Sequence, residues 1–151
     1  MLSPCWLSML LFAASGFASG VQSKQPPPSA AVSRTFEDAV ARGSYPIDIH
    51  DPQGKGTILR RLPAGGAYDI PLRCLLPDGV DRLLVAGRCI SGTHEAHSSY
   101  RVTPIAMATG HAAGVCAAIA AATNEPPRDV DHRAVQLELV RQGANLRSEI
   151  A

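Results

Sequence analysis

The sequence predicts an α/β fold, and three neighbouring segments carry this prediction. The apolar run Leu83–Ala86 is short, has no polar alternation and ends at Gly87–Arg88, which is typical of a strand buried on both faces of a parallel sheet. A polar segment follows from Ser91 to Arg101, and an alanine-rich segment with helical spacing begins at Thr103. We therefore expect a buried strand, a polar loop and a tightly packed helix.

The alanine-rich segment has the start signals of a helix. Thr103 is suited to the N-cap, and Pro104 to the first helical position, where a missing N–H costs nothing. Small residues recur three or four apart, and we expect the face they form to approach a sheet closely: Ala106, Gly110, Ala113, Gly114, Ala117 and Ala121. A membrane span is the alternative, but Ala and Gly contribute little transfer energy, so a buried helix is favoured.

Small antiparallel elements are expected before this unit. Arg34–Arg42 predicts a short helix capped by Thr35, and the alternating segments Tyr45–His50 and Thr57–Leu62 predict a hairpin. The stretch from Tyr68 to Leu76 predicts an edge or irregular strand, because it contains a proline.

A second helix is expected near the end of the chain. Val130–Arg141 has amphipathic spacing and is followed by Gly143, which suits a helix terminus.

The size and charge of the chain limit its function. Its 151 residues allow one modest domain with one core. A net charge of +1, a charged fraction of 18% and the lack of a basic run argue against nucleic-acid binding.

The first residues resemble a secretory signal peptide. Met1–Gly20 is apolar and ends in small residues, although no Lys or Arg precedes the apolar core. We assign residues 1–23 either to a signal or to an artefact of the start site, and residues 24–33, which contain three consecutive prolines, to a linker. A true signal predicts a secreted or periplasmic protein, and an artefact predicts a cytoplasmic one.

The predicted loop offers a ligand site. Ligands of open α/β sheets bind at the carboxyl ends of strands, and a helix start favours an anionic or electron-rich atom. Arg88 and Arg101 flank the loop and are suited to charge-assisted hydrogen bonds. The alternative is an ordinary strand-to-helix connection whose arginines face water.

Other polar residues carry weaker signals. His94-Glu-Ala-His97 is one residue short of a zinc-protease pattern, and in a loop we do not expect it to bind a metal. Cys5, Cys74, Cys89 and Cys116 are scattered, without the spacing of an iron–sulfur ligand run. Asp48 and His50 are either substrate-facing residues or residues that satisfy a turn.

The segment from Tyr68 to Ala121, YDIPLRCLLPDGVDRLLVAGRCISGTHEAHSSYRVTPIAMATGHAAGVCAAIAA, resembles the C-terminal part of the FAD-dependent oxidoreductases, near the heterodisulfide reductase A-type flavoproteins. The upstream piece GSYPIDIHDPQGKGT and the tail DVDHRAVQLELVRQGANL resemble the corresponding parts of the same family. The resemblance spans roughly Val32 to Leu146, and Leu83–Gly114 is its most specific part.

This resemblance implies a Rossmann-like FAD domain interrupted by a cap or substrate domain. Residues 34–80 would belong to the cap domain, and residues 81–146 would supply the last strand and closing helix of the FAD domain. The family pattern places Gly87 and Arg88 by the ribityl–phosphate portion of FAD, and Arg101, Val102, Thr103 and Ile105 by the ring. Iron–sulfur clusters occur in the wider family.

The implied function is hydride transfer between an organic substrate and FAD. However, the G-x-G-x-x-G turn that holds the pyrophosphate in such domains does not occur in these 151 residues. We therefore expect a C-terminal piece of a larger flavoprotein, whose missing half is supplied by the same or another chain. The alternative is a non-catalytic remnant, or a secreted binding module, that does not hold FAD alone.

Overall fold

The computed structural model describes residues 35–50, 53–54, 56–90 and 92–147. The signal and linker predictions for residues 1–23 and 24–33 lie outside this part of the chain. Four strands and three α-helices follow in order: β1 (Ala39–Gly43), β2 (Ile47–His50), β3 (Thr57–Arg60), β4 (Tyr68–Pro71), α1 (His94–Tyr100), α2 (Thr103–Thr123) and α3 (His132–Arg141). Two 3-10 turns, η2 (Leu72–Leu75) and η3 (Gly87–Cys89), lie between β4 and α1. The fold is thus mixed, as predicted.

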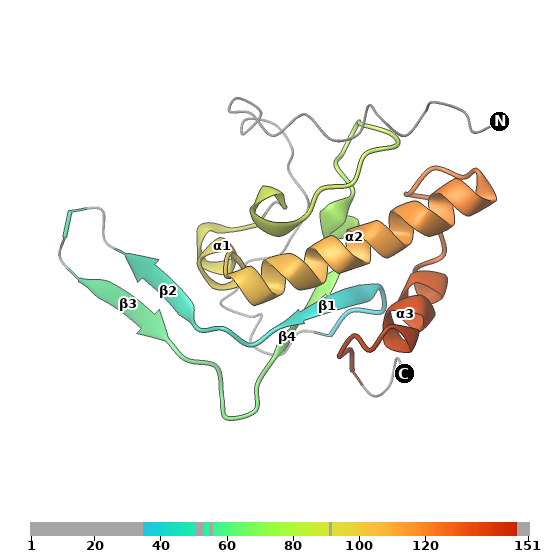
Figure 1. Ribbon diagram of the computed structural model, residues 1–151. Helices are drawn as coiled ribbons and strands as arrows, with labels where there is room; N and C mark the ends of the chain where they lie inside the picture. Colours follow the sequence, from blue (N-terminus) through green and yellow to red (C-terminus); the bar gives the residue numbers. More distant parts are fainter. Residues whose placement is uncertain (1–34, 51–52, 55, 91, 148–151) are drawn as a thin grey trace.

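The strands form two small sheets. β1 pairs with β4, with Arg42 opposite Asp69 and Gly43 opposite Tyr68, and β2 pairs with β3 as the predicted hairpin. Both pairs are antiparallel, so the described residues contain no parallel sheet. The β2–β3 hairpin projects from the body as an arm (Figure 1). β3 is exposed along its whole length, because nothing else in the described chain covers it.

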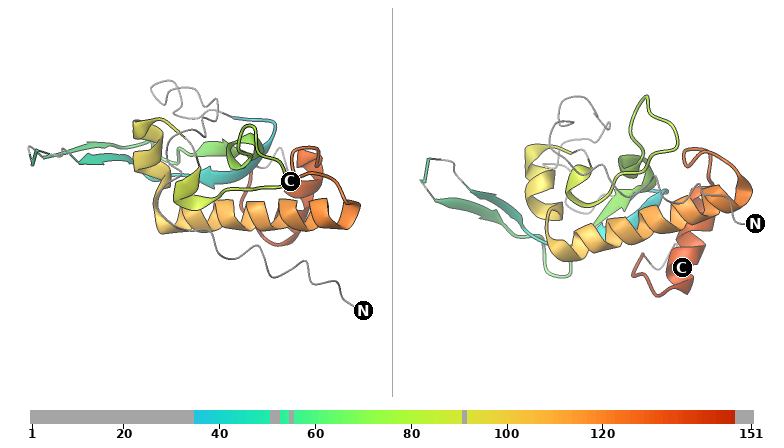
Figure 2. Two further views of the ribbon diagram at one scale, coloured as in Figure 1. Left: turned by 90° about the horizontal axis from the view of Figure 1, so that it is seen from above. Right: turned by 45° about the horizontal axis from the view of Figure 1, so that its top comes forward.

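The body consists of the β1–β4 pair and the three helices. α2 runs along one face of the pair, α1 lies near the base of the hairpin, and α3 lies toward the other end of α2 (Figures 1 and 2). Apolar side chains from these elements form one core. Its largest fully buried members include Tyr100, Ile70, Leu75, Leu139, Val40 and Val135.

The prediction of a buried strand at Leu83–Ala86 is wrong. These residues have no regular secondary structure and belong to neither sheet, and Leu83 is 43% exposed. The N–H of Val85 donates to the carbonyl of Leu75 at 2.9 Å, and the carbonyl of Ala86 accepts the N–H of Cys89 at 3.2 Å. A strand requires a neighbouring strand, and the described chain places none beside this segment.

The helix predicted for Arg34–Arg42 is also wrong in its described part. Residues 39–43 form β1, because they pair with β4. Asp38, within the segment predicted as a helix, accepts the backbone N–H of Arg73 and pairs with its guanidinium. These long-range contacts hold the segment extended.

The long helix is confirmed, but the face that it buries is not the predicted one. α2 begins at Thr103, one residue before the predicted first turn, with Val102 at the N-cap. The side chains that α2 buries are Ile105, Thr109, Ala112, Val115, Cys116 and Ala120. Gly110, Gly114 and Ala121 are exposed, because the larger side chains fill the space against the core.

α2 is also long and apolar enough to cross a membrane. Its best 18-residue window has a mean hydropathy of 1.6, and 33% of that window is buried. Core helices of soluble proteins meet the same criterion, so length and hydropathy do not distinguish a membrane span from a core helix here.

The remaining elements follow the sequence closely. α3 begins two residues after the predicted start, with Asp131 capping the N–H of Arg133. The edge strand predicted within Tyr68–Leu76 is β4, which pairs on one side only and passes into η2 after Pro71.

Candidate functional site

The turn η3 meets the first half of α2 through a glycine. Gly87 has a φ of 62°, which favours glycine, and its N–H donates to Thr109 Oγ1 at 2.9 Å. A Cβ atom added at Gly87 would lie 3.4 Å from the Cβ of Ala106. A glycine at this position therefore allows η3 to adopt its positive φ and to pack closely against α2.

The first turn of α2 leaves backbone donors without a helical partner. The first hydrogen bond of the helix runs from the N–H of Ala106 to the carbonyl of Val102, at 3.0 Å. The N–H groups of Thr103 and Ile105 precede this bond, and Pro104 has none. Val102 provides no side-chain cap, and the first turn contains no acidic residue. This helix start is therefore suited to an electron-rich ligand atom.

Arg88 and Arg101 are brought together, but not as two free cations. Arg88 Nε donates to the backbone carbonyl of Arg101 at 3.0 Å, which ties η3 to the residue between α1 and α2. Arg101 Nη2 donates to the backbone carbonyl of Asp48 at 3.3 Å and lies 3.7 Å from Asp48 Oδ2. The arginines thus link the predicted loop to the β2–β3 hairpin instead of only facing water.

The hairpin therefore contributes Asp48 and His50 to the same site. The Asp48 side chain is 17% exposed, and its Oδ2 lies 3.4 Å from His50 Nε2. The other ring nitrogen of His50 lies 3.1 Å from Thr57 Oγ1, in the paired strand. His50 thus makes contacts within the hairpin, with Thr57 and Asp48, and a substrate-facing role for it stays a prediction.

Two site contacts were missed because they join distant residues. Asp48 and Arg101 are 53 positions apart, and the Gly87–Thr109 bond spans 22 positions. Gly87, between a short apolar run and Arg88, gave a local signal of a turn, but that signal does not identify Thr109 as its hydrogen-bond partner.

The segment that we predicted as a loop is the helix α1. Thr93 caps it by accepting the N–H of Ala96 at 3.2 Å. A chain of hydroxyl groups fixes the helix: Tyr68 donates to Ser99 Oγ at 2.7 Å, and Ser99 donates to the carbonyl of Tyr45 at 2.6 Å. This chain joins α1 to β4 and to the start of the hairpin, so it holds the frame of the site.

A family model described as FAD dependent oxidoreductase matches residues 27–139. This match covers every described strand and most of the last helix. The chain belongs to the FAD dependent oxidoreductase family. No curated protein and no solved structure matches it.

The residues at the start of α2 fit the cofactor named by this family. The pyrimidine ring of a flavin presents carbonyl oxygens, for which backbone N–H groups at a helix start such as that of α2 are suitable donors. Arg101 precedes Thr103 by two residues, and its guanidinium, 36% exposed, contacts Asp48. Gly87 keeps the neighbouring backbone free of a side chain. The family implies FAD, and the donors at this helix start are compatible with it.

The described cysteines and histidines do not form a metal-binding group. Cys74, Cys89 and Cys116 are free thiols, and burial raises the pKa of Cys74 to about 11 and also raises that of Cys116. In the part of the chain that the structure describes, no three His, Cys, Asp or Glu residues lie close enough to share an ion. His97 instead packs its ring against Tyr100, with centroids 5.2 Å apart.

Proposed function

We propose that this chain is the C-terminal part of a flavin-dependent oxidoreductase that transfers hydride between an organic substrate and FAD. The observation that carries the proposal is the family match over residues 27–139, which includes the donor-rich start of α2. FAD, when bound, supplies the hydride chemistry, and the protein supplies position and electrostatics.

The proposed roles follow the chemistry of each residue. Arg101 balances negative charge on the flavin ring, while the backbone N–H groups of Thr103 and Ile105 orient its polar edge. Ile105, whose side chain is 5% exposed, keeps water from that edge, and Val102 lies beside it at the N-cap.

Two residues are proposed at the other end of the cofactor. Gly87 and Arg88 serve the ribityl–phosphate portion, where a backbone without Cβ and an exposed guanidinium suit a phosphate ester.

We further propose that the family member is of the heterodisulfide reductase A type. Residues 34–80 would then form part of the cap or substrate domain, and residues 81–146 the last part of a Rossmann-like FAD domain. The resemblance of Leu83–Gly114 supports this assignment. The absence of a G-x-G-x-x-G turn from the 151 residues supports a phosphate-binding half supplied elsewhere, in the same or another chain.

A second candidate is a non-catalytic remnant, or a secreted module, that keeps this part of the fold without FAD. The missing G-x-G-x-x-G turn and the signal-like segment Met1–Gly20 favour it. It needs no partner that carries the phosphate-binding turn, whereas the oxidoreductase requires one.

The first experiment is to measure the intact mass and the flavin absorbance of the native protein on one sample. A mass well above 15.9 kDa together with bound flavin supports the oxidoreductase. A mass near 15.9 kDa without flavin, and without a partner that restores flavin binding, supports the remnant.

Replacement of Arg101 tests the site itself. Arg101→Ala in the flavin-loaded protein should lower the flavin content or shift the flavin reduction potential, because a positive charge near the ring is lost. Arg128→Ala is the matched control, since Arg128 is also partly exposed but pairs with Asp81, away from the start of α2. Unchanged flavin content and potential in Arg101→Ala would count against this site.

A further inference from the structure

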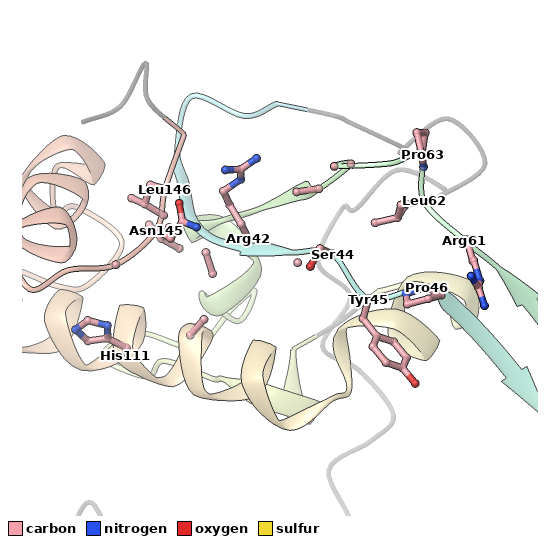
Figure 3. A pocket seen from close by; sticks show the side chains of 18 of the residues that line it. Arg42, Ser44, Tyr45, Pro46, Arg61, Leu62, Pro63, His111, Asn145 and Leu146 are labelled. Carbon is pink, nitrogen blue, oxygen red and sulfur yellow. The ribbon is translucent and has the colours of Figure 1, made fainter.

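A cleft of about 960 Å³ lies beside β1 and outside the residues proposed for FAD. Its walls come from β1, the link between β1 and β2, the β3–β4 connection, α2 and the segment after α3. None of the six residues proposed for FAD lines it. Figure 3 shows Arg42 in the middle of the view, His111 on one side and Arg61 on the other.

The charged side chains of the cleft are all basic. Arg42 and Arg61 line it, together with His111, and no described lining residue is Asp or Glu. Arg61 is exposed, and no carboxylate of the described chain forms an ion pair with it. The cleft is therefore electropositive, which favours anionic ligands.

Among these residues, Arg42 gives the strongest support for an anionic ligand. Its Nε is buried and has no hydrogen-bond partner among the described residues. The nearest carboxylate oxygen, Asp69 Oδ1, is 3.8 Å away, which is too long for a hydrogen bond. A ligand in the cleft does not reach this buried atom but meets the exposed part of the side chain, since Arg42 lines the cleft and its side chain is 31% exposed.

The carboxylate of Asp69 is already engaged by other donors. Asp69 Oδ2 accepts Arg147 Nε at 2.8 Å and the N–H of Phe36 at 3.1 Å. Two guanidinium groups thus share one carboxylate, and Arg147 takes the shorter contact. Arg42 is left with positive charge at the cleft.

The rest of the lining suits an organic ligand and not a bare ion. Leu62, Pro63 and Leu146 supply apolar wall, and Asn145 and Ser44 supply neutral polar groups. In Figure 3 the Asn145–Leu146 segment and the Leu62–Pro63 connection stand on opposite sides of Arg42. A ligand with an apolar body and one anionic group matches this lining.

We propose that this cleft binds an organic anion, with its carboxylate or phosphate on Arg42, its apolar body between Leu62 and Leu146, and Arg61 attracting it at the rim. This site goes beyond the proposed oxidoreductase function, and its test does not require flavin.

The test is isothermal titration of the full chain with three small probes of similar shape. 3-Phenylpropionate carries a carboxylate, phenyl phosphate carries a phosphate ester, and neutral 3-phenylpropanamide carries no charge. We expect at least one anion to bind saturably and the amide to bind about tenfold more weakly, which is the usual effect of one charge-assisted hydrogen bond. The stronger of the two anions identifies the ligand class.

Three variants locate the binding. Arg42→Gln should weaken the anion about tenfold, and Arg61→Gln should weaken it less and mainly at low salt. Arg60→Gln is the matched control, because Arg60 is the neighbouring exposed arginine and does not line the cleft. If Arg42→Gln does not fold, judged by circular dichroism, the difference between Arg61→Gln and Arg60→Gln decides. No saturable binding, equal binding of the amide, or equal losses in Arg60→Gln and Arg61→Gln would overturn the proposal.

Discussion

Substitution of Gly43 by alanine should break the contact between β1 and the tyrosine that supports α1. Gly43 ends β1 directly opposite Tyr68, whose ring lies over the glycine. A Cβ atom at Gly43 would be 2.7 Å from Tyr68 Cε2, so the ring has to move. The ring cannot move freely, because its hydroxyl is bonded to Ser99 at 2.7 Å.

The expected cost follows from three effects. Overpacking of a well-filled site costs about 1–3 kcal/mol, and the loss of the Tyr68–Ser99 hydrogen bond costs about 1 kcal/mol. Alanine also lowers the conformational entropy of the unfolded chain, which stabilises the folded state by about 0.5 kcal/mol. This gain applies because the φ of Gly43 is not positive, so alanine can adopt it. The free energy of unfolding should therefore fall by about 2 kcal/mol.

A double-mutant cycle measured by urea unfolding tests this reasoning. In a Tyr68→Ala background the obstructing ring is absent, so Gly43→Ala should be neutral or slightly stabilising, with a coupling energy of about 2 kcal/mol. Gly110→Ala is the control, because this helical glycine has open space around it, and the change should stabilise α2 by about 0.5–1 kcal/mol. An equal cost of Gly43→Ala in both backgrounds would refute the steric explanation.

Three further predictions concern the frame around the site. Asp69→Asn removes a carboxylate that is 2% exposed and contacts Arg147 Nε at 2.8 Å, so urea unfolding should show a loss of about 3–5 kcal/mol; a loss below about 1 kcal/mol would contradict this role. Gly87→Ala forces an L-residue into a φ of 62° near Ala106, and the same assay should show a loss of about 1–2 kcal/mol, whereas wild-type stability would show that the turn relaxes. Burial raises the pKa of Tyr68 to about 12, against about 10 in the unfolded chain, so the stability present below pH 10 should fall between about pH 10 and 12 by about 1.4 kcal/mol per pH unit. Urea unfolding across this range should show a shallower fall for Tyr68→Phe, and an unchanged slope would refute the assignment.

The sequence by itself determined the elements whose signals are local. α2 and α3 were predicted because helical spacing, capping residues and terminating residues all lie within a few positions of each other. The β2–β3 hairpin was predicted because two alternating segments flank a turn-like link, although that link is longer than the tightest hairpin loops. Arg88 and Arg101 were also singled out from the sequence because they flank a predicted ligand loop, whereas Gly87 was proposed only through the family resemblance.

Only the tertiary structure decided the elements whose conformation depends on distant partners. Ala39–Gly43 had local helix signals, but pairing with β4 made it a strand. Leu83–Ala86 was apolar enough for a buried strand, yet the described chain provides no strand beside it. In both cases the outcome depends on whether a distant segment lies alongside as a strand partner, which local pattern cannot specify.

Contacts between distant elements also decide the surroundings of the arginines at the two candidate sites. The contact of Arg101 with Asp48 and the unsatisfied Nε of Arg42 arise from packing between elements that are distant in sequence. The sequence marks the arginines as candidates, but burial and the competition for Asp69 are set only when β1, β4 and the segment after α3 come together. Packing therefore determines which arginine takes the short contact with Asp69 and which is left without a hydrogen-bond acceptor for its Nε.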